Sequence, residues 1–418
     1  MENPSQKYDV IIIGGGPSGM MAALSVMKHH PEFSVAIIDR TFELGRKVLV
    51  TGAGRGNLTN SNLKQHPEKP YHGNQEFIAS VFSQFPYDNI LKFFDELGVP
   101  LYEEKKTNKG KMFPVIDHAK TIRDILLDEI TQHNITVIVN TIVTAMSRQG
   151  DKWIVTGGDV SFSSKYLIVS TGGRTYPSLG SDGTGFDLLK SLGHTIITLV
   201  PSAVPVVSKN LLSHLLQGEK MNMEAQVLID GKPVSRATGD VMFTQYGFSG
   251  PAVFDISRDF SVRINREGKS DTTIRLNFFP ERTKEEVRVE LVKRFTKHPD
   301  FPVAHCLWGL LPQKIAGAVC ATAKLPIEMV AKNVIDEHVT SLVTILTSFE
   351  AEISGTRGWN EAEFTAGGVN TDEVSPTLES KKSHRVYITG EILDVDGPVG
   401  GYNLSWAWAT GFIAGKLQ

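Results

Sequence analysis

Glycines at fixed spacing near the start of the chain are the residues with the clearest chemical meaning. Gly14, Gly16 and Gly19 follow the apolar run from Tyr8 to Ile13 and precede a helix-like stretch. That order of strand, turn and helix is typical of a phosphate-binding G-x-G-x-x-G turn. The first glycine permits the bend, the second lets a pyrophosphate approach the backbone, and the third lets helix and strand pack closely. Free N–H groups at the start of the helix then favour the phosphates.

An acidic residue completes this dinucleotide motif. A second apolar strand, Ser34 to Ile38, ends at Asp39, twenty residues after Gly19. A carboxylate at this position can accept hydrogen bonds from an adenosine ribose. A glycine turn without a ligand is the alternative, but strand, turn, helix and acid all fall where the motif requires them. The predicted contacts in this region also include Pro17, Ser18 and Arg40.

A second glycine-rich signal near the other end of the chain separates FAD from NAD, which both fit a G-x-G-x-x-G turn. A strand-like run ends in Gly390-Glu391, where an acid can bind the polyol hydroxyls of a ribityl chain. The residues Gly400 to Leu404 then begin a helix whose amides can stabilise negative charge on a reduced flavin ring. A structural glycine turn is the alternative. The predicted contacts are Gly390, Glu391, Gly401, Tyr402, Asn403 and Leu404.

The elements that hold these residues come from both ends of the chain. Strand-like runs alternate with helical stretches in the first 195 residues, which predicts an α/β fold. A last strand, Arg385 to Thr389, returns to the same sheet. The strand Tyr166 to Ser170 returns there as well, and we expect the turn that follows it, Thr171-Gly172, to contact the cofactor.

The middle of the chain has a different pattern. Alternating runs such as Ala225 to Ile229, the turn Asp230-Gly231 and the run Val262 to Ile264 predict antiparallel hairpins. A capping-box pattern, Thr283 with Glu286, then opens a helical stretch. We therefore expect an FAD-binding domain made of residues 1–195 and 364–418, with an inserted β domain (196–280), an inserted helical region (281–348) and a return segment (349–363).

Four motifs occur in order along nearly the whole chain, at residues 45–60, 248–251, 365–369 and 390–397, and the last of them contains Gly390-Glu391. With these motifs the chain resembles the BaiN-type family of NAD(P)/FAD-dependent oxidoreductases, also called aminoacetone-oxidase-like flavoproteins. The resemblance implies a glutathione-reductase-type FAD-binding Rossmann-like domain with an inserted β-barrel and helical domain. It also implies that adenine meets the backbone of Val143. The other contacts implied are Arg46, Lys47, Thr51, Gly52, Gly54 and Asn57.

Position 56 departs from the pattern of that family. The family's loop usually reads Gly-Gly-Gly-Arg-Cys-Asn, whereas residues 52–57 of this chain read Gly-Ala-Gly-Arg-Gly-Asn. Gly56 replaces the cysteine, so any role of a thiol beside the cofactor is absent here. We expect FAD binding to persist, because glycine still permits close approach of the backbone.

The sequence assigns no catalytic acid or base. Arg174 and Tyr176 are candidates for the substrate side of the flavin, and a surface loop explains them equally well. The histidines lack metal-ligand spacing, so we predict no metal. The stretch Gly180 to Gly185 differs from the G-x-G-x-x-G spacing and follows no strand directly. A separate NAD(P)-binding domain is therefore not expected.

Charge and composition constrain the partners. The 418 residues contain 43 Lys and Arg against 46 Asp and Glu, a net charge of −3, so no overall basic field attracts nucleic acid or anionic lipid. We expect a small-molecule substrate and neither a nucleic-acid nor a membrane partner. The only two cysteines, Cys306 and Cys320, are expected to be buried and reduced. The polar residues 1–7 lack a secretory pattern, which favours the cytoplasm.

Taken together, the residues predict an FAD-dependent oxidoreductase that transfers a hydride between a small organic substrate and noncovalently bound flavin. The other electron partner is either oxygen or transiently bound NAD(P)H, and the sequence does not separate the two. A flavin-binding sensor or macromolecule-binding protein is one alternative, and a flavin-dependent RNA-modifying enzyme is another. Neither the substrate nor the oligomeric state follows from the sequence.

Overall fold

The computed structural model describes residues 6–105 and 109–418, and its contacts divide the chain into two compact units. The first unit contains the residues up to Leu199 together with Phe364–Gln418, and the second is Val200–Glu363. Both ends of the chain therefore belong to the first unit.

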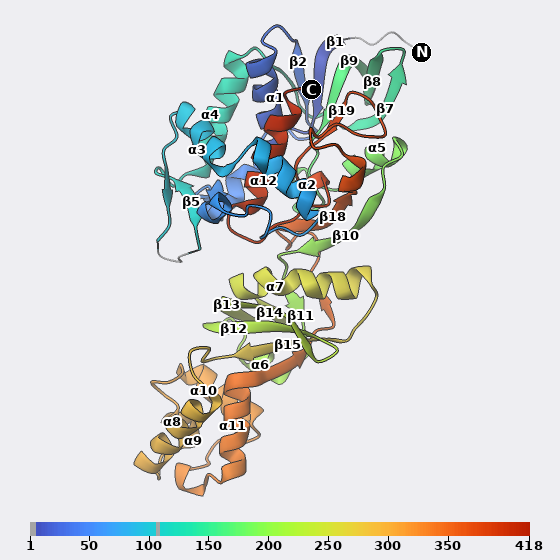
Figure 1. The fold of residues 1–418 in the computed structure, drawn as a ribbon. Helices are drawn as coiled ribbons and strands as arrows, with labels where there is room; N and C mark the ends of the chain where they lie inside the picture. The colour runs from blue at the N-terminus through green and yellow to red at the C-terminus, as the bar shows by residue number, and fades with distance from the viewer. Residues whose placement is uncertain (1–5, 106–108) are drawn as a thin grey trace. The chain divides into compact units, whose positions relative to one another are not determined.

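A parallel sheet forms the centre of the first unit (Figure 1). Its strands follow the order β6-β2-β1-β9-β19, and each neighbouring pair in this order is parallel. The antiparallel strands β7 and β8 extend it beside the first half of β9. The strands predicted at residues 34–38 and 385–389 are confirmed. The bounds are β1 (Gln6–Ile13), β2 (Val35–Ile38), β6 (Thr136–Ile138), β7 (Val143–Gln149), β8 (Lys152–Gly157), β9 (Val160–Val169) and β19 (Val386–Ile388).

Burial explains why these apolar runs form strands. Val10 to Ile13 of β1 and every residue of β2 are buried. A parallel sheet is covered on both faces, so its strands carry continuous apolar runs rather than alternating ones. Because β1, β2 and β9 are parallel, their carboxyl ends lie at one edge of the sheet. Ligands bind at this edge in open α/β folds.

Helices α1 (Pro17–His29) and α12 (Tyr402–Ala414) pack against each other beside this sheet (Figure 1). Their backbones are close, because a Cβ atom placed on Gly411 would lie 2.3 Å from the carbonyl oxygen of Ser18. Trp406 and Trp408 of α12 are buried in the same core. The helix that begins at the C-terminal glycine signal therefore rests on the helix that begins at the N-terminal one.

Shorter elements complete the first unit. A small antiparallel sheet has the order β3-β5-β4, and β10 pairs with β18. The helices are α2 (Gln75–Gln84), α3 (Tyr87–Glu96), α4 (Ala119–Gln132) and α5 (Gly185–Ser191), with 3-10 helices η1 (Arg46–Gly54), η2 (Ser61–Lys64), η3 (Pro177–Leu179), η6 (Thr371–Glu373) and η7 (Gly390–Ile392). The strands are β3 (Thr59–Asn60), β4 (Leu101–Glu103), β5 (Lys111–Pro114), β18 (Phe364–Val369) and β10 (Ile196–Ser202), whose last three residues belong to the second unit.

The second unit contains an antiparallel sheet with the order β16-β15-β12-β13-β14-β11-β17. Asp230 and Gly231, with φ of +49° and +72°, turn β12 into β13, so the predicted hairpin is confirmed. The two edge strands of this sheet are neighbours along the chain, because β16 pairs with β15 while β17, just after it, pairs with β11. The bounds are β11 (Val206–Val207), β12 (Lys220–Ile229), β13 (Lys232–Thr244), β14 (Gly247–Ser249), β15 (Thr272–Asn277), β16 (Phe349–Glu352) and β17 (Gly355–Thr356).

The strand predicted at Val262 to Ile264 is wrong. These residues belong to a π-helical turn, η4 (Val262–Arg266), that directly continues helix α7 (Pro251–Ser261). Helix α7 packs on β12 and β13 and buries one side, which includes Ile256 and Phe260. Tertiary packing of this helix outweighs the preference of Val262 and Ile264 for strands. The strand of this region is β15, further along the chain.

Helices fill the rest of the second unit. Both hydrogen bonds of the predicted capping box form between Thr283 and Glu286 at the start of α8. Cys306 and Cys320 are buried and free, as predicted. The bounds are α6 (Leu211–Leu215), α8 (Lys284–Lys297), α9 (Val303–Cys306), α10 (Gln313–Thr322), η5 (Ala331–Asn333) and α11 (Asp336–Ser348).

Candidate cofactor-binding site

The N-terminal glycine turn has one open position between two crowded ones. Gly14 has a φ of +99°, and a Cβ atom there would lie 2.6 Å from the carbonyl oxygen of Ser170. A Cβ atom on Gly19 would lie 2.0 Å from the carbonyl oxygen of Gly14. At Gly16, by contrast, no atom of the described chain lies within 4 Å of that position. The turn is closed on its protein side, and its face at Gly16 has room for a phosphate group.

Helix α1 begins at this open position. Pro17 is its first residue, and no side chain in the described part of the protein caps it at Gly16. Its first backbone N–H groups are therefore available to a ligand, and the positive end of the helix dipole favours an anion. Ser18 is buried, and a Cβ atom on Gly390 would lie 2.5 Å from its hydroxyl oxygen. The two glycine signals are thus in contact.

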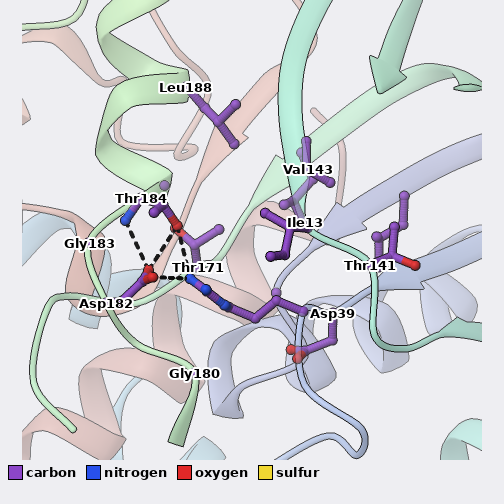
Figure 2. Close-up of a pocket in the computed structure, with 15 residues that line it drawn as sticks. Ile13, Asp39, Thr141, Val143, Thr171, Gly180, Asp182, Gly183, Thr184 and Leu188 are labelled. Atoms are coloured by element: carbon purple, nitrogen blue, oxygen red, sulfur yellow. Dashed lines mark hydrogen bonds and ion pairs between the residues drawn. The ribbon is translucent and has the colours of Figure 1, made fainter. Parts of the chain in front are cut away.

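A pocket, called here the Asp39 pocket, lies where β1, β2 and β9 end (Figure 2). Asp39 Oδ2 accepts a hydrogen bond from the N–H of Gly15 at 2.6 Å. Asp39 Oδ1 accepts from the N–H and the hydroxyl of Thr41, each at 2.7 Å. The apolar side chains that line the pocket include Ile13 and Leu188. The pocket brings together the predicted contacts Gly14, Asp39, Arg40, Val143 and Thr171.

One wall of the Asp39 pocket is a loop that sequence reasoning missed. Gly180 and residues 182–185 line the pocket, and Figure 2 shows Asp182 and Thr184 opposite Asp39. Asp182 Oδ1 accepts from the N–H and the hydroxyl of Thr184 at 3.1 and 2.8 Å. Burial raises the pKa of Asp182, but these hydrogen bonds and the ion pair with Arg40 outweigh it and lower the pKa. The loop's sequence signal is its glycines, whose spacing alone indicates no ligand.

The Asp39 pocket fits the adenosine half of FAD. Thr171 lines it, and its buried hydroxyl has no hydrogen-bond partner among the described residues. Apolar side chains can cover an adenine ring, and Asp39 offers an acceptor to ribose hydroxyls. With the open face at Gly16, the donors and acceptors match an adenosine diphosphate.

A mostly buried ion pair joins the loop after β2 to the C-terminal glycine signal. Glu391 Oε2 accepts from Lys47 Nζ at 2.7 Å, and the side chains are 17% and 25% exposed, respectively. Glu391 Oε1 accepts from the N–H of Thr365 at 3.0 Å and from the hydroxyl of Thr175 at 3.2 Å. Burial raises the pKa of Glu391, but Lys47 and the hydrogen bonds lower it by more. The carboxyl group is therefore ionised at neutral pH.

These four residues, Lys47, Thr175, Thr365 and Glu391, form what we call the Lys47–Glu391 cluster. Glu391 Oε2 retains capacity for one further donor, and its contact with a ribityl hydroxyl stays a prediction. Sequence reasoning missed Thr175 and Thr365 as partners of Glu391, although Thr365 begins one of the motifs. Tyr176 follows Thr175 and has a φ of +56°, which is rare for a bulky residue.

Arg46 and Gly172 contact the segment before α5 rather than the Lys47–Glu391 cluster. Arg46 Nη1 donates to the carbonyl oxygen of Ser178 at 2.9 Å, and its guanidinium carbon lies 4.8 Å from the ring centre of Phe42. Gly172 has a φ of +74°, and a Cβ atom there would lie 3.1 Å from the hydroxyl oxygen of Ser181. Their contacts with the cofactor stay predictions.

The predicted contacts in residues 51–57 shape their own loop. Thr51 Oγ1 donates to a carbonyl oxygen one turn earlier, at 2.7 Å. The side-chain amide of Asn57 donates to carbonyl oxygens of β3 and β5 at 3.1 and 3.0 Å. Gly52, Gly54 and Gly56 have φ of +56°, +86° and +83°, a region that favours glycine. The loop's path thus depends on its glycines, and contact with FAD stays a prediction.

Helix α12 begins at the C-terminal glycine signal, with no side-chain cap from the described residues. Gly401 has a φ of +97° and directly precedes Tyr402, the first residue of the helix. The side chain of Asn403 bonds the N–H and the carbonyl oxygen of one residue in the preceding turn, at 2.9 and 2.8 Å. Leu404 packs half-buried against the core, and Gly390 donates to a hydroxyl of α12 at 3.0 Å. Like any α-helix, α12 leaves the amides of its first turn without partners inside the helix itself.

Comparison with known proteins identifies the family. A family model described as HI0933-like protein Rossmann domain matches residues 8–417. The chain belongs to this family. It is 34% identical over 411 residues to a 3-dehydro-bile acid delta(4,6)-reductase of Clostridium scindens, with 97% of both chains covered. It is also 27% and 29% identical to ribosomal RNA dihydrouridine synthases of Escherichia coli and Haemophilus influenzae, with 98% of each chain covered.

Solved structures share the fold at low sequence identity. A 3-ketosteroid-delta4-(5alpha)-dehydrogenase of Rhodococcus jostii matches with a TM-score of 0.50 and 11% identity, over 99% of this chain and 98% of that one. A quinol-fumarate reductase matches with a TM-score of 0.50 and 14% identity, over 98% and 70%. The fold is thus the predicted Rossmann-like one, and the resemblance drawn from the motifs is confirmed.

The protein is an FAD-dependent oxidoreductase of the HI0933-like family. Across residues 6–105 and 109–418, every helix is too short or too polar to span a bilayer.

Proposed function

We propose that this enzyme reduces a carbon–carbon double bond conjugated to a carbonyl group, with NAD(P)H as the electron source. One hydride from NAD(P)H and one proton from water balance the two hydrogens added. The observation that carries the proposal is that the names of both kinds of relative, the reductase and the dihydrouridine synthases, describe this reaction. A delta(4,6)-reductase of a 3-oxo steroid saturates double bonds conjugated to that ketone. Dihydrouridine is uridine whose ring double bond, conjugated to a carbonyl, has been saturated.

The residues of the site would position FAD for this reaction. Bound FAD supplies two-electron hydride chemistry. The amino end of α1 at Gly16 would bind the pyrophosphate, and Asp39 would accept hydrogen bonds from the adenosine ribose. The amino end of α12 at Gly401 would stabilise negative charge at the pyrimidine side of the ring. The ion pair between Lys47 and Glu391 would keep the loop after β2 beside η7, where Gly390 bonds Trp406 and Thr410 of α12.

A small organic molecule is our first candidate for the substrate. The relative that is 34% identical acts on a steroid according to its name. The net charge of −3 offers no overall basic field for RNA. Uridine in ribosomal RNA is the second candidate, because two relatives with that named activity match over 98% of the chain.

Two free buried thiols support a reducing compartment such as the cytoplasm.

Anaerobic turnover by the FAD-loaded protein tests the reaction class. NADH or NADPH would be mixed with a 3-oxo-4,6-diene steroid or with a ribosomal RNA fragment that contains uridine, and products would be identified by mass spectrometry. We expect one NAD(P)H to be oxidised for each double bond saturated, and a saturated 3-oxo steroid to give no oxidation. Saturation of RNA alone would select the second candidate. Peroxide formed from oxygen and an amine, without saturation of either probe, would show an oxidase instead.

A further inference from the structure

We propose that Arg40, Asp182 and Thr184 form a clasp across the Asp39 pocket that sets how long FAD stays bound. The proposal depends on FAD as the cofactor and not on the choice of substrate. None of these three side chains belongs to the glycine motif. Arg40 directly follows Asp39 at the end of β2, whereas Asp182 and Thr184 lie on the loop before α5.

The three side chains connect two walls of the pocket. Arg40 pairs with a carboxylate oxygen of Asp182, and its Nη1 also donates to the Thr184 hydroxyl at 3.1 Å. The other carboxylate oxygen of Asp182 accepts from the N–H and the hydroxyl of Thr184. Figure 2 shows Asp182 and Thr184 on the side of the pocket opposite Asp39 and Val143. A ligand between these walls would be enclosed by the clasp.

Glycines let this loop approach the rest of the pocket. Gly180 has a φ of +106°, and a Cβ atom there would lie 2.5 Å from the methyl carbon of Thr41, next to Arg40. A Cβ atom on Gly185 would lie 1.9 Å from the hydroxyl oxygen of Thr171, the buried group without a partner. The loop therefore rests on the pocket at both of its ends. Between those ends, the clasp is its only charged link to β2 among the described residues.

The clasp acts on release more than on capture. The side chains of Arg40 and Asp182 are 30% and 27% exposed, so water can reach the pair and the pair can open. An adenosine would enter and leave through the open state, and a closed pair that stabilises the bound adenosine makes its departure slower. Variants of this kind usually change the dissociation rate more than the association rate. A flavin without an adenosine does not reach this pocket and should be unaffected.

Flavin release from the purified protein tests the clasp without any turnover. The variants are Arg40→Ala, Asp182→Asn and the exchanged pair Arg40→Asp with Asp182→Arg. Asp187→Asn is the matched control, because it breaks an exposed ion pair with Lys190 on the neighbouring helix α5 outside the pocket lining. Dissociation rates of FAD and of FMN, which lacks the adenosine, would be measured by flavin fluorescence after dilution.

We expect both single variants to release FAD about ten times faster than the unmodified protein, and the exchanged pair to restore part of that loss. FMN release and the Asp187→Asn control should stay unchanged. Equal acceleration for FAD and FMN would overturn the proposal, because the loop would then support the whole domain rather than the adenosine end. Unchanged FAD release in both single variants would overturn it too. Neither result depends on whether the enzyme saturates double bonds, so the proposed reaction is tested separately.

Discussion

The Asp39 pocket and the Lys47–Glu391 cluster, two parts of the same unit, are built on different physical principles. The glycine side of the pocket depends on backbone: its turn is fixed by steric limits at Gly14 and Gly19, and Asp39 holds the N–H of Gly15. The cluster depends on side-chain charge, with Lys47 and Glu391 contributed by segments far apart in the chain. A motif built from backbone is readable from a short sequence. A motif built from charge becomes visible only when its segments meet.

Removal of the charge on Glu391 should have the largest effect on folding. Glu391→Gln leaves Lys47 mostly buried without an anion, and breaking such a pair is costly. We expect the free energy of unfolding of the FAD-free protein to fall by about 2–3 kcal/mol, since the pair is partly exposed. Urea unfolding followed by the buried Trp406 and Trp408 would measure it.

The control for this prediction is a double variant, Lys47→Met with Glu391→Gln, which removes both charges. It should lose less stability than the sum of the two single variants, because residues in contact are coupled. Strictly additive losses would mean that the two charges act independently. In that case the contrast between a charge-built cluster and a backbone-built pocket would be lost.

Two glycine substitutions in one turn should separate folding from binding. Gly19→Ala places a Cβ atom 2.0 Å from a backbone oxygen, and we expect about 1–3 kcal/mol of destabilisation from this overpacking. Gly16→Ala meets no atom, so the FAD-free protein should keep its melting temperature. The added methyl group would nevertheless fill the face that we assign to the pyrophosphate. Isothermal titration with FAD should therefore show a large loss of affinity for Gly16→Ala, and unchanged affinity would contradict that assignment.

Asp39→Ala should mainly weaken the cofactor. The variant removes the ribose acceptor and leaves the N–H of Gly15 unpaired, which should cost about 1–3 kcal/mol of FAD binding. Asp9→Ala is a matched control, since Asp9 bonds Ser34 at the exposed opposite end of the same strands. Equal FAD affinity in Asp39→Ala and the unmodified protein would show that the acid serves the turn alone.

A pH experiment at His194 should give the smallest effect. His194 Nε2 lies 2.7 Å from the hydroxyl oxygen of Ser380. That oxygen accepts hydrogen bonds from two backbone N–H groups, so its own O–H is the donor in the hydrogen bond to Nε2. Burial lowers the pKa of His194, although Glu373 beside its Nδ1 opposes the change. At neutral pH the His194 imidazole is therefore neutral. Glu391, which has Lys47 beside it, is charged at the same pH.

Because the pKa of His194 is lower in the folded protein, the unfolded chain binds the proton first as pH falls below about 6.5. The stability contribution of His194 is present above that pH and is lost as pH decreases toward the folded pKa. Melting temperatures would be measured at neutral pH and at about pH 5.5 for the unmodified protein and for His194→Gln. The difference between the two pH values should be smaller in the variant. An equal pH dependence in both proteins would exclude His194 as its source.

Sequence patterns predicted the elements in which local and tertiary preferences agree. The strand and turn at Gly14 are an example, because burial on both faces and the steric needs of the bend point to one structure. Val262 to Ile264 shows the opposite case, where β-branched residues suited to a strand continue helix α7 instead. The packing partners of α7 are strands β12 and β13, which no local pattern at Val262 can indicate.

The sequence by itself determined the kind of ligand and the fold class, because glycine spacing and apolar periodicity act over a few neighbouring residues. It also placed Asp39 and Glu391 at strand ends. Only the tertiary structure decided that Arg40 faces Asp182 and that Lys47 neutralises Glu391. Ion pairs between distant segments have no local signature, since their energy depends on distance and burial, and both quantities exist only once the chain has folded.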